Sequence, residues 1–325
     1  MPSTDEDILR AAMRRCTEEV HAPASIAAQV VSRQRRRERR GRILTLTATT
    51  AALGTAAGVV ALVPRQAAPN PGAHPARPAI TLTAAQRTLY RLSSLAATAS
   101  PGQGQGRYVV MREIQDNYQR TSVIDSRTGD VWTFQKGAGV PAELPVARHD
   151  SPTQAQFAAM PTDPAALRAL LISQYDQQQK QADAAMAAQL KQKDRILRGQ
   201  HRPAIKPLRL TADDKVFEQA NLLLWNPLVP PALRSAVFRV LAATPGVRVN
   251  SHARDDRGRP AVEISWFDRV TSDTLATFED PSTTRMLEQT DTAAPAGVNG
   301  HSTYTGRDLY LSITRASSVP ANPYR

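Results

Sequence analysis

Apolar and polar residues follow two different periods along the chain, and the order of these periods predicts the fold class. Apolar residues recur at helical spacing in four segments, residues 81–99, 161–175, 213–225 and 230–247. They alternate with polar residues, as in strands, in five segments, residues 107–115, 121–137, 247–267, 274–290 and 307–317. Helix, strands, helices, strands is the order of an α+β domain, so we expect a curved antiparallel sheet packed on helices.

Turn residues join several of the expected strands into hairpins. The sequence SRTGD at 126–130 predicts one turn, and DDRGR at 255–259 and DPSTTR at 280–285 predict two more. We interpret Asp255 and Asp256 as part of a plain turn, because the neighbouring arginines argue against a calcium site.

One helix is predicted to be much longer than the others. Asp163 can cap it, Pro164 suits its first position, and no strong stop occurs before Gly199. Leu167, Leu170 and Leu171 give its beginning a core face, whereas QYDQQQKQ at 174–181 is polar all round. We expect a long basic helix that protrudes into solvent from the domain, over the insertion 177–209. The alternative is a charged arm that touches lipid headgroups or an acidic wall polymer.

Residues 43–63 form an apolar stretch that is long enough to cross a bilayer. The stretch holds 21 residues without a charge and ends at Pro64. As a helix it spans roughly 31 Å, close to the thickness of the hydrocarbon layer. We predict one transmembrane helix here, with a buried helix of a soluble protein as the alternative. Gly54 and Gly58 form a GxxxG pair, which would allow a homodimer within the membrane.

Arginines gather on one side of this stretch. Seven lie in residues 33–42, and only Arg65 lies just after the stretch. Because such residues stay on the cytoplasmic side, we expect a cytoplasmic N-terminus and an extracytoplasmic C-terminal domain at the cell membrane. A cleaved signal peptide is an alternative, but its n-region would be unusually long, so we favour an uncleaved signal anchor.

The formal net charge of +12 is uneven along the chain. Residues 1–42 hold ten Arg against six acids, and residues 180–209 hold eight Lys and Arg against two acids. The rest of the large domain is close to neutral, so the total does not predict a broad nucleic-acid-binding face. The arginine run in residues 33–42 could itself bind nucleic acid, but membrane topology explains it.

These observations divide the chain into four parts: a cytoplasmic helical tail (1–42), a transmembrane helix (43–63), a Pro-rich linker (64–79) and an extracytoplasmic α+β domain (80–325). The sequence of the tail predicts two short helices, which together are too small to form a hydrophobic core of their own. They either dock on a cytoplasmic protein partner or act as a passive leader, and both readings stay open.

Motifs of catalysis and metal binding are absent from the sequence. The single cysteine, Cys16, excludes an internal disulfide, and the six histidines show no ligand spacing. They are His21, His74, His149, His201, His252 and His301.

The run His149-Asp150-Ser151 holds three triad residue types, but adjacent residues do not easily form the nucleophile–base–orienter arrangement of a catalytic triad. The glycines of PGQGQGRY precede a strand, whereas phosphate loops follow one. We expect no enzyme and no catalytic, cofactor-binding or metal-binding residues; Trp132, Trp225 and Trp266 should line the core or a groove.

Four segments of the large domain resemble an actinobacterial family of mostly uncharacterised single-pass membrane proteins with a layout like that of anti-sigma factors. They are MPTDPAALRALL at 160–171, VPPALRSAVFRVLAATPGVRV at 229–249, DDRGRPAVEIS at 255–265 and TFEDPSTTRMLEQT at 277–290. Thr283-Thr284 stands where the family usually has Thr-Gly. The resemblance implies a domain similar to lipoprotein-carrier and sigma-regulator domains, in which a curved sheet wraps helices and offers an apolar groove. It implies no catalytic residues.

Two function classes follow. The first is a non-enzymatic, membrane-anchored extracytoplasmic binding or sensor protein linked to envelope or sigma-factor regulation, which recognises a lipid or an acidic envelope polymer. The second is a lipid or lipoprotein carrier without signalling, and a cytosolic nucleic-acid binder is a third, less favoured reading. A large apolar pocket between sheet and helices would favour the carrier, whereas a filled core would favour recognition.

Overall fold

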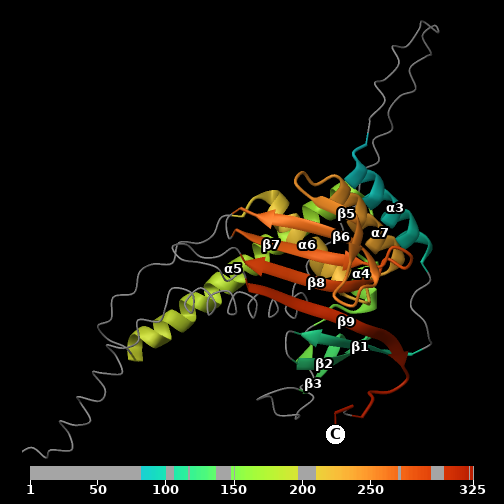
Figure 1. Ribbon diagram of the computed structural model, residues 1–325. Helices are drawn as coiled ribbons and strands as arrows, with labels where there is room; N and C mark the ends of the chain where they lie inside the picture. The colour runs from blue at the N-terminus through green and yellow to red at the C-terminus, as the bar shows by residue number, and fades with distance from the viewer. Residues whose placement is uncertain are drawn as a thin grey trace, which may run out of the picture.

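The computed structural model describes residues 82–99, 106–115, 118–136, 148–149, 151–196, 210–269, 272–293, 304–321 and 323–324. The described part is α+β, with helices packed on one face of an antiparallel sheet (Figure 1). The helices are α3 (Ala84–Thr98), α4 (Gln154–Ala158), α5 (Pro164–Ile196), α6 (Ala212–Trp225) and α7 (Pro231–Ala242). The strands are β1 (Tyr108–Gln115), β2 (Tyr118–Asp125), β3 (Asp130–Lys136), β4 (Arg148–His149), β5 (Arg248–Arg254), β6 (Pro260–Asp268), β7 (Asp273–Glu279), β8 (Met286–Ala293) and β9 (Tyr304–Ala316).

Two meanders make up the sheet, and they join along β1 and β9. The strand order is β4-β3-β2-β1-β9-β8-β7-β6-β5, so the first strand of the first meander pairs with the last strand of the second. The pairing runs from Tyr108 opposite Ala316 to Gln115 opposite Asp308, with a register shift after Arg112. Helices α4 to α7 lie between the two meanders in the chain, which confirms the predicted α+β order.

The predicted hairpin turns are confirmed. Asp255 accepts hydrogen bonds from the backbone N–H groups of Arg257 and Arg259 and pairs with the Arg259 side chain, as in a plain turn. The turn after β7 is built around Asp280, whose Oδ1 accepts from the backbone N–H groups of Ser282 and Thr283. Because short polar side chains replace water at these turns, the strands on either side keep their register.

Side-chain caps set the beginnings of the helices. Thr83 and Thr211 form capping boxes at α3 and α6, and Asp163 accepts from the Ala166 N–H at the start of α5. The predicted start of the long helix is therefore confirmed. Helix α3 packs against α7, where Ser93 and Ser235 share a buried hydrogen bond of 2.9 Å.

One hydrophobic core fills the space between the helices and the sheet. Leu92 of α3, Leu171 of α5, Phe217 of α6, Phe238 of α7 and Ile264 of β6 are each at most 2% exposed. A smaller cluster of Val110, Val123 and Phe134 lies on the other sheet face, where Tyr324 near the C-terminus packs on it. The sheet therefore has a hydrophobic cluster on each face, and the cluster on the helix-covered face is much the larger.

The middle of α5 corrects one prediction. Residues 174–181 are not polar all round in solvent, because Tyr175 is only 7% exposed and Asp176 pairs with Lys215 of α6 at 2.7 Å. Gln178 also accepts from Gln219 of α6. Past this contact α5 extends away from the other elements (Figure 1).

No helix within the described ranges is both long and apolar enough to cross a bilayer. The predicted transmembrane helix (43–63), the tail and the linker all lie outside the described residues.

Candidate functional site

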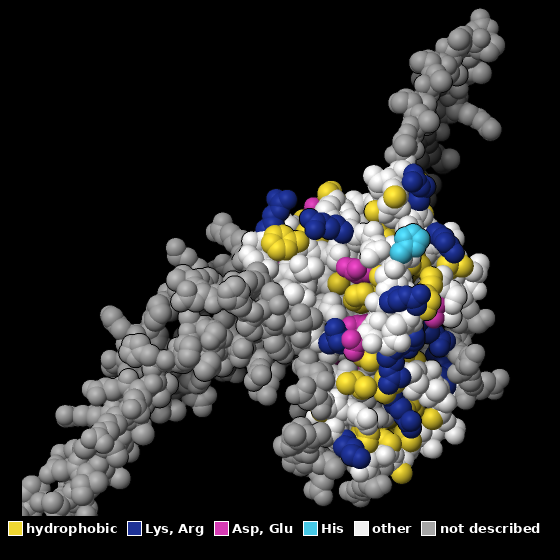
Figure 2. Space-filling view, viewed as in Figure 1, with side chains coloured by type: hydrophobic (Ala, Val, Ile, Leu, Met, Phe, Trp, Pro, Cys, Tyr) yellow, Lys and Arg dark blue, Asp and Glu magenta, His cyan; other side chains and the backbone are white. Residues whose placement is uncertain are grey.

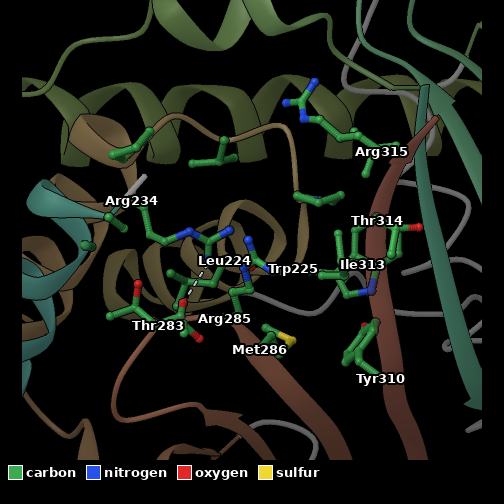
Figure 3. A pocket seen from close by; sticks show the side chains of 17 residues that line it. Leu224, Trp225, Arg234, Thr283, Arg285, Met286, Tyr310, Ile313, Thr314 and Arg315 are labelled. Atoms are coloured by element: carbon green, nitrogen blue, oxygen red, sulfur yellow. Dashed lines mark hydrogen bonds between the residues drawn. The ribbon is translucent and has the colours of Figure 1, made fainter. Parts of the chain in front are cut away.

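A small cavity lies where one end of the helical layer meets the sheet (Figure 3). Its volume is about 80 Å³. Its walls come from the end of α3, the end of α6 and the loop after it, the first turn of α7, the turn between β7 and β8, and strands β1 and β9. Elements from several distant parts of the sequence therefore converge on one space.

Apolar and cationic groups share the wall of this cavity. Ala96, Val109, Leu224, Val229 and Met286 form much of the apolar part and also belong to the main core. Three arginines supply the charge, namely Arg234, Arg285 and Arg315, and no aspartate or glutamate is among the lining residues. The wall is thus electropositive.

Arg234 is the central charged residue of the cavity. Its Nη1 donates to the carbonyls of Leu224 (2.9 Å) and Thr284 (3.3 Å), and its Nη2 donates to the Asn226 carbonyl at 3.2 Å. It thereby caps the end of α6 and ties it to the β7–β8 turn. Burial lowers the pKa of Arg234, the charge of Glu279 acts in the opposite direction, and the nearby Arg285 guanidinium lowers the pKa again. An arginine nevertheless stays charged at any ordinary pH, so a full positive charge lies half-buried here.

Arg285 approaches Arg234 from the β7–β8 turn. In Figure 3 the guanidinium groups of the two residues point toward one another, whereas Arg315 points away from both and donates to the Gly106 carbonyl at 3.1 Å. The Arg285 side chain makes no hydrogen bond or ion pair with any residue that the structure describes. Two like charges thus lie close together, which disfavours both unless an anion joins them.

Glu279 lies at the end of β7, and its charge acts on Arg234. It is fully buried, on the same strand face as Leu275, and neither carboxyl oxygen has a hydrogen-bond partner among the described residues. Burial raises the pKa of Glu279 to about 8, although the charge of Arg234 acts in the opposite direction. At neutral pH Glu279 is therefore mostly protonated, and it does not neutralise Arg234.

Thr284 holds the wall of the cavity in a strained conformation. Its φ of 56° lies in the left-handed region, which is an outlier for a β-branched residue. The side chain is fully buried, and its hydroxyl has no hydrogen-bond partner in the described part of the chain. Its carbonyl accepts from Arg234. Such strain is maintained only where the surroundings impose it, and it is often found at functional sites.

The structure describes only some of the residues considered from sequence. Ser151 is buried and accepts a hydrogen bond from Asn226 at 3.2 Å, while Asp150 lies outside the described residues. His252 is exposed on β5, and His149 forms part of β4. Among the described residues, no group of three His, Cys, Asp or Glu could hold a metal ion. The remaining histidines and Cys16 lie outside the described ranges.

The tryptophans occupy the kinds of positions that the sequence predicted. Trp225 lines the cavity, and Trp266 stacks on Phe217 with ring centroids 5.6 Å apart. Trp132 packs against Tyr108 beside the smaller cluster. Core and groove positions are thus confirmed for these residues.

The sequence analysis did not identify Arg234, Arg285 and Glu279. Arg234 sits in the amphipathic segment LRSAVFRV, where an arginine is normally a surface residue. The available signal was strand alternation, because Leu275, Thr277 and Glu279 share one face and that face is the core face.

Comparison of the chain with protein-family models, with curated proteins and with solved structures gives no match.

Proposed function

We propose that this protein is a non-enzymatic, membrane-anchored binding protein whose extracytoplasmic domain recognises a small component of the cell envelope. The observation that supports recognition is the cavity of about 80 Å³ beside the main hydrophobic core. Sites for drug-sized molecules measure about 300–1,000 Å³. The cavity therefore suits one small group rather than a whole lipid.

This size argues against the carrier reading. A carrier must remove one or more acyl chains from water, and that requires a long apolar space between sheet and helices. In this domain the corresponding space is occupied by side chains such as Phe217, Phe238 and Leu233, each at most 2% exposed. The charged wall would also be unfavourable for a hydrocarbon chain.

The surface charges argue against nucleic-acid binding by this domain. Lys and Arg side chains form a band over the sheet face seen in Figure 2, with Asp and Glu beside them. Arg307 in this region pairs with both Asp256 and Glu288, and Arg259 pairs with Asp255. Carboxylates that pair with these arginines neutralise much of their charge, which weakens attraction to the phosphates of a nucleic acid.

The N-terminal part of the proposal rests on the sequence. The uncharged stretch 43–63 and the arginines before it support a single-pass anchor with a cytoplasmic tail. The resemblance to a family with an anti-sigma-like layout supports a role in envelope or sigma-factor regulation. In this proposal the domain binds outside, and the tail has a protein partner inside.

Cys16 provides a test of the topology because it is the only thiol in the chain. A membrane-impermeant maleimide applied to intact cells should leave Cys16 unlabelled, and permeabilisation should allow labelling of a 35.4 kDa membrane protein. A shorter product without Cys16 would indicate a cleaved leader. Full-length protein in the soluble fraction would contradict the anchor.

Recognition can be tested with the full chain in non-ionic detergent. Water-soluble or lipid fractions of a cell envelope should raise its melting temperature, because a ligand that binds only the folded state stabilises it. Trp225→Ala, which changes the cavity wall, should lose this shift relative to its own unliganded value. Trp132→Ala on the other sheet face should keep it. If no fraction shifts the wild-type protein, the proposal of a binding function is wrong.

A further inference from the structure

The geometry points to the group that the cavity binds: we propose that Arg234 and Arg285 form a site for a phosphate group with two negative charges. This inference rests on the proposed binding function and names its ligand class. It is argued from the charge of the wall, the free donors and the size of the cavity.

Charge balance is the first argument. The cavity wall holds two guanidinium groups and no carboxylate, and Glu279, the buried acid whose charge acts on Arg234, makes no hydrogen bond to it and is not a lining residue. The carbonyls of Leu224, Asn226 and Thr284 accept from Arg234, but carbonyl dipoles do not cancel a net charge. A charge that is partly removed from water is stabilised by a charged partner. An anion in the cavity would be that partner.

Free donors are the second argument. A guanidinium has five N–H bonds, and Arg234 uses three of them on carbonyls. The remaining two, together with those of Arg285, can donate to an oxyanion, and paired arginine donors match phosphate oxygens well. The first turn of α7 also reaches the wall at Pro231, and its cap residue Pro230 makes no side-chain hydrogen bond. The partial positive charge of that helix end adds to the attraction.

Size and charge together favour phosphate over a single carboxylate. The cavity is well below the size of sites for drug-sized molecules, so it suits one compact group. Two guanidiniums are balanced by two negative charges, and a phosphate monoester carries about −1.5 to −2 at pH 7. Apolar wall residues such as Val229 and Ile313 would contact whatever the phosphate is attached to.

Inorganic phosphate is the first probe, titrated calorimetrically into the full chain in non-ionic detergent at low salt. We expect saturable binding of one phosphate per chain. Arg285→Gln should weaken it at least about tenfold, and Arg285→Lys by less, because Lys keeps the charge without the planar fork. Arg257→Gln is the matched control, since Arg257 is exposed in the β5–β6 turn and is not among the lining residues. It should bind like the wild type.

Two further arms separate the sources of phosphate. Dihexanoyl phosphatidic acid that displaces inorganic phosphate and loses affinity in Arg285→Gln would identify a lipid headgroup. Binding of inorganic phosphate without such displacement would identify free phosphate or a soluble phosphate ester. Either result supports the site.

The opposite results are equally clear. Any of three results would overturn the phosphate site. Acetate could bind as tightly as phosphate, neither phosphate nor phosphatidic acid could bind, or Arg285→Gln could bind phosphate as well as the wild type. If the envelope fractions still raise the melting temperature in that case, the binding function survives with another ligand class. If they do not, both proposals are wrong.

Discussion

At the scale of single residues, this domain keeps several polar groups under unusual conditions, and they gather at one place. Arg234 is a half-buried cation, Glu279 is a buried acid without a hydrogen bond to any residue that the structure describes, and Thr284 has a left-handed backbone conformation. Each of these costs stability by itself. Their proximity supports the proposal that the β7–β8 turn is shaped for binding rather than for stability.

Glu279 should make folding stability depend on pH. Its pKa is raised from 4.5 to about 8 in the folded protein, so the native state holds a proton that the unfolded chain releases above its ordinary pKa. The contribution is therefore complete below about pH 4.5 and is lost as the pH rises toward 8. We expect the free energy of unfolding to fall by a few kcal/mol, on the order of 1.4 kcal/mol per pKa unit.

Urea unfolding of wild type and Glu279→Gln between pH 5 and 9 measures this effect. Glutamine cannot ionise, so the variant should lose this part of the pH dependence. Glu288, whose pKa is also raised, is common to both proteins, so the difference between them isolates Glu279. An identical decline in both would show that Glu279 is not protonated in the folded state.

The variant Thr284→Gly should be more stable than the variant Thr284→Ala. At a φ of 56° glycine has no steric cost, whereas a residue with a Cβ atom pays roughly 1–2 kcal/mol. Thr284→Gly should therefore exceed Thr284→Ala by about 1 kcal/mol in the free energy of unfolding. At the exposed neighbour Thr283, whose φ is not positive, the order should reverse. The same order at both positions would contradict the strain argument.

At the scale of the elements, one carboxylate fastens a helix to the sheet. Asp214 accepts from Thr211 at the start of α6 through one oxygen, and from Trp266 Nε1 of β6 through the other at 3.0 Å. Asp214 thus combines a helix cap with a tertiary hydrogen bond, and Trp266 then stacks on Phe217 of the same helix.

Asp214→Ala should consequently cost about 3 kcal/mol, since it removes the helix cap and three hydrogen bonds to a charged group, and leaves the half-buried Trp266 N–H unpaired. Asp213→Ala is the control at the next position. Asp213 pairs with Arg168, but both side chains are about one-third exposed, so its loss should cost no more than about 1 kcal/mol. Urea midpoints followed by tryptophan fluorescence compare the two. Equal losses would mean that the bond to Trp266 adds no stability.

Local patterns were sufficient to predict most elements, but not their partners. Thr83, Asp163 and Thr211 begin helices through side chains close in sequence, and the turns around Asp255 and Asp280 are equally local. The error at residues 174–181 arose because Asp176 and Gln178 find partners on α6, about 40 residues later. Arg234 and Arg285 escaped notice for the same reason, since only the folded chain brings them together.

At the scale of the whole molecule, pairing of β1 with β9 makes one sheet from two meanders. The junction is narrow where β1 begins. A Cβ atom added to Gly106 would lie 2.4 Å from the Ala316 carbonyl oxygen, and that backbone is fixed by the sheet. Strand β9, about 200 residues later in the sequence, therefore leaves no room for a side chain at position 106.

Gly106→Ala should lower stability by about 3 kcal/mol, at the upper end for an overpacked site, because backbone rather than a side chain must move. Gly258→Ala serves as comparison. Gly258 has a positive φ but nothing within 4 Å of its Cβ position, so strain alone should cost about 1 kcal/mol. Both variants should unfold in a single transition. Two separate transitions in Gly106→Ala would show that the meanders fold independently.

The β1–β9 pairing also dictates an order of events during synthesis. The ribosome completes β1 first and its neighbour β9 last, with nearly the whole domain between them. At about 5–20 residues per second, β1 waits on the order of ten seconds or more with one edge unpaired. An unpaired edge readily pairs with other chains. The nascent domain is therefore most vulnerable to misassembly just before its last strand emerges, so its yield should depend more on chaperone supply than its final stability suggests.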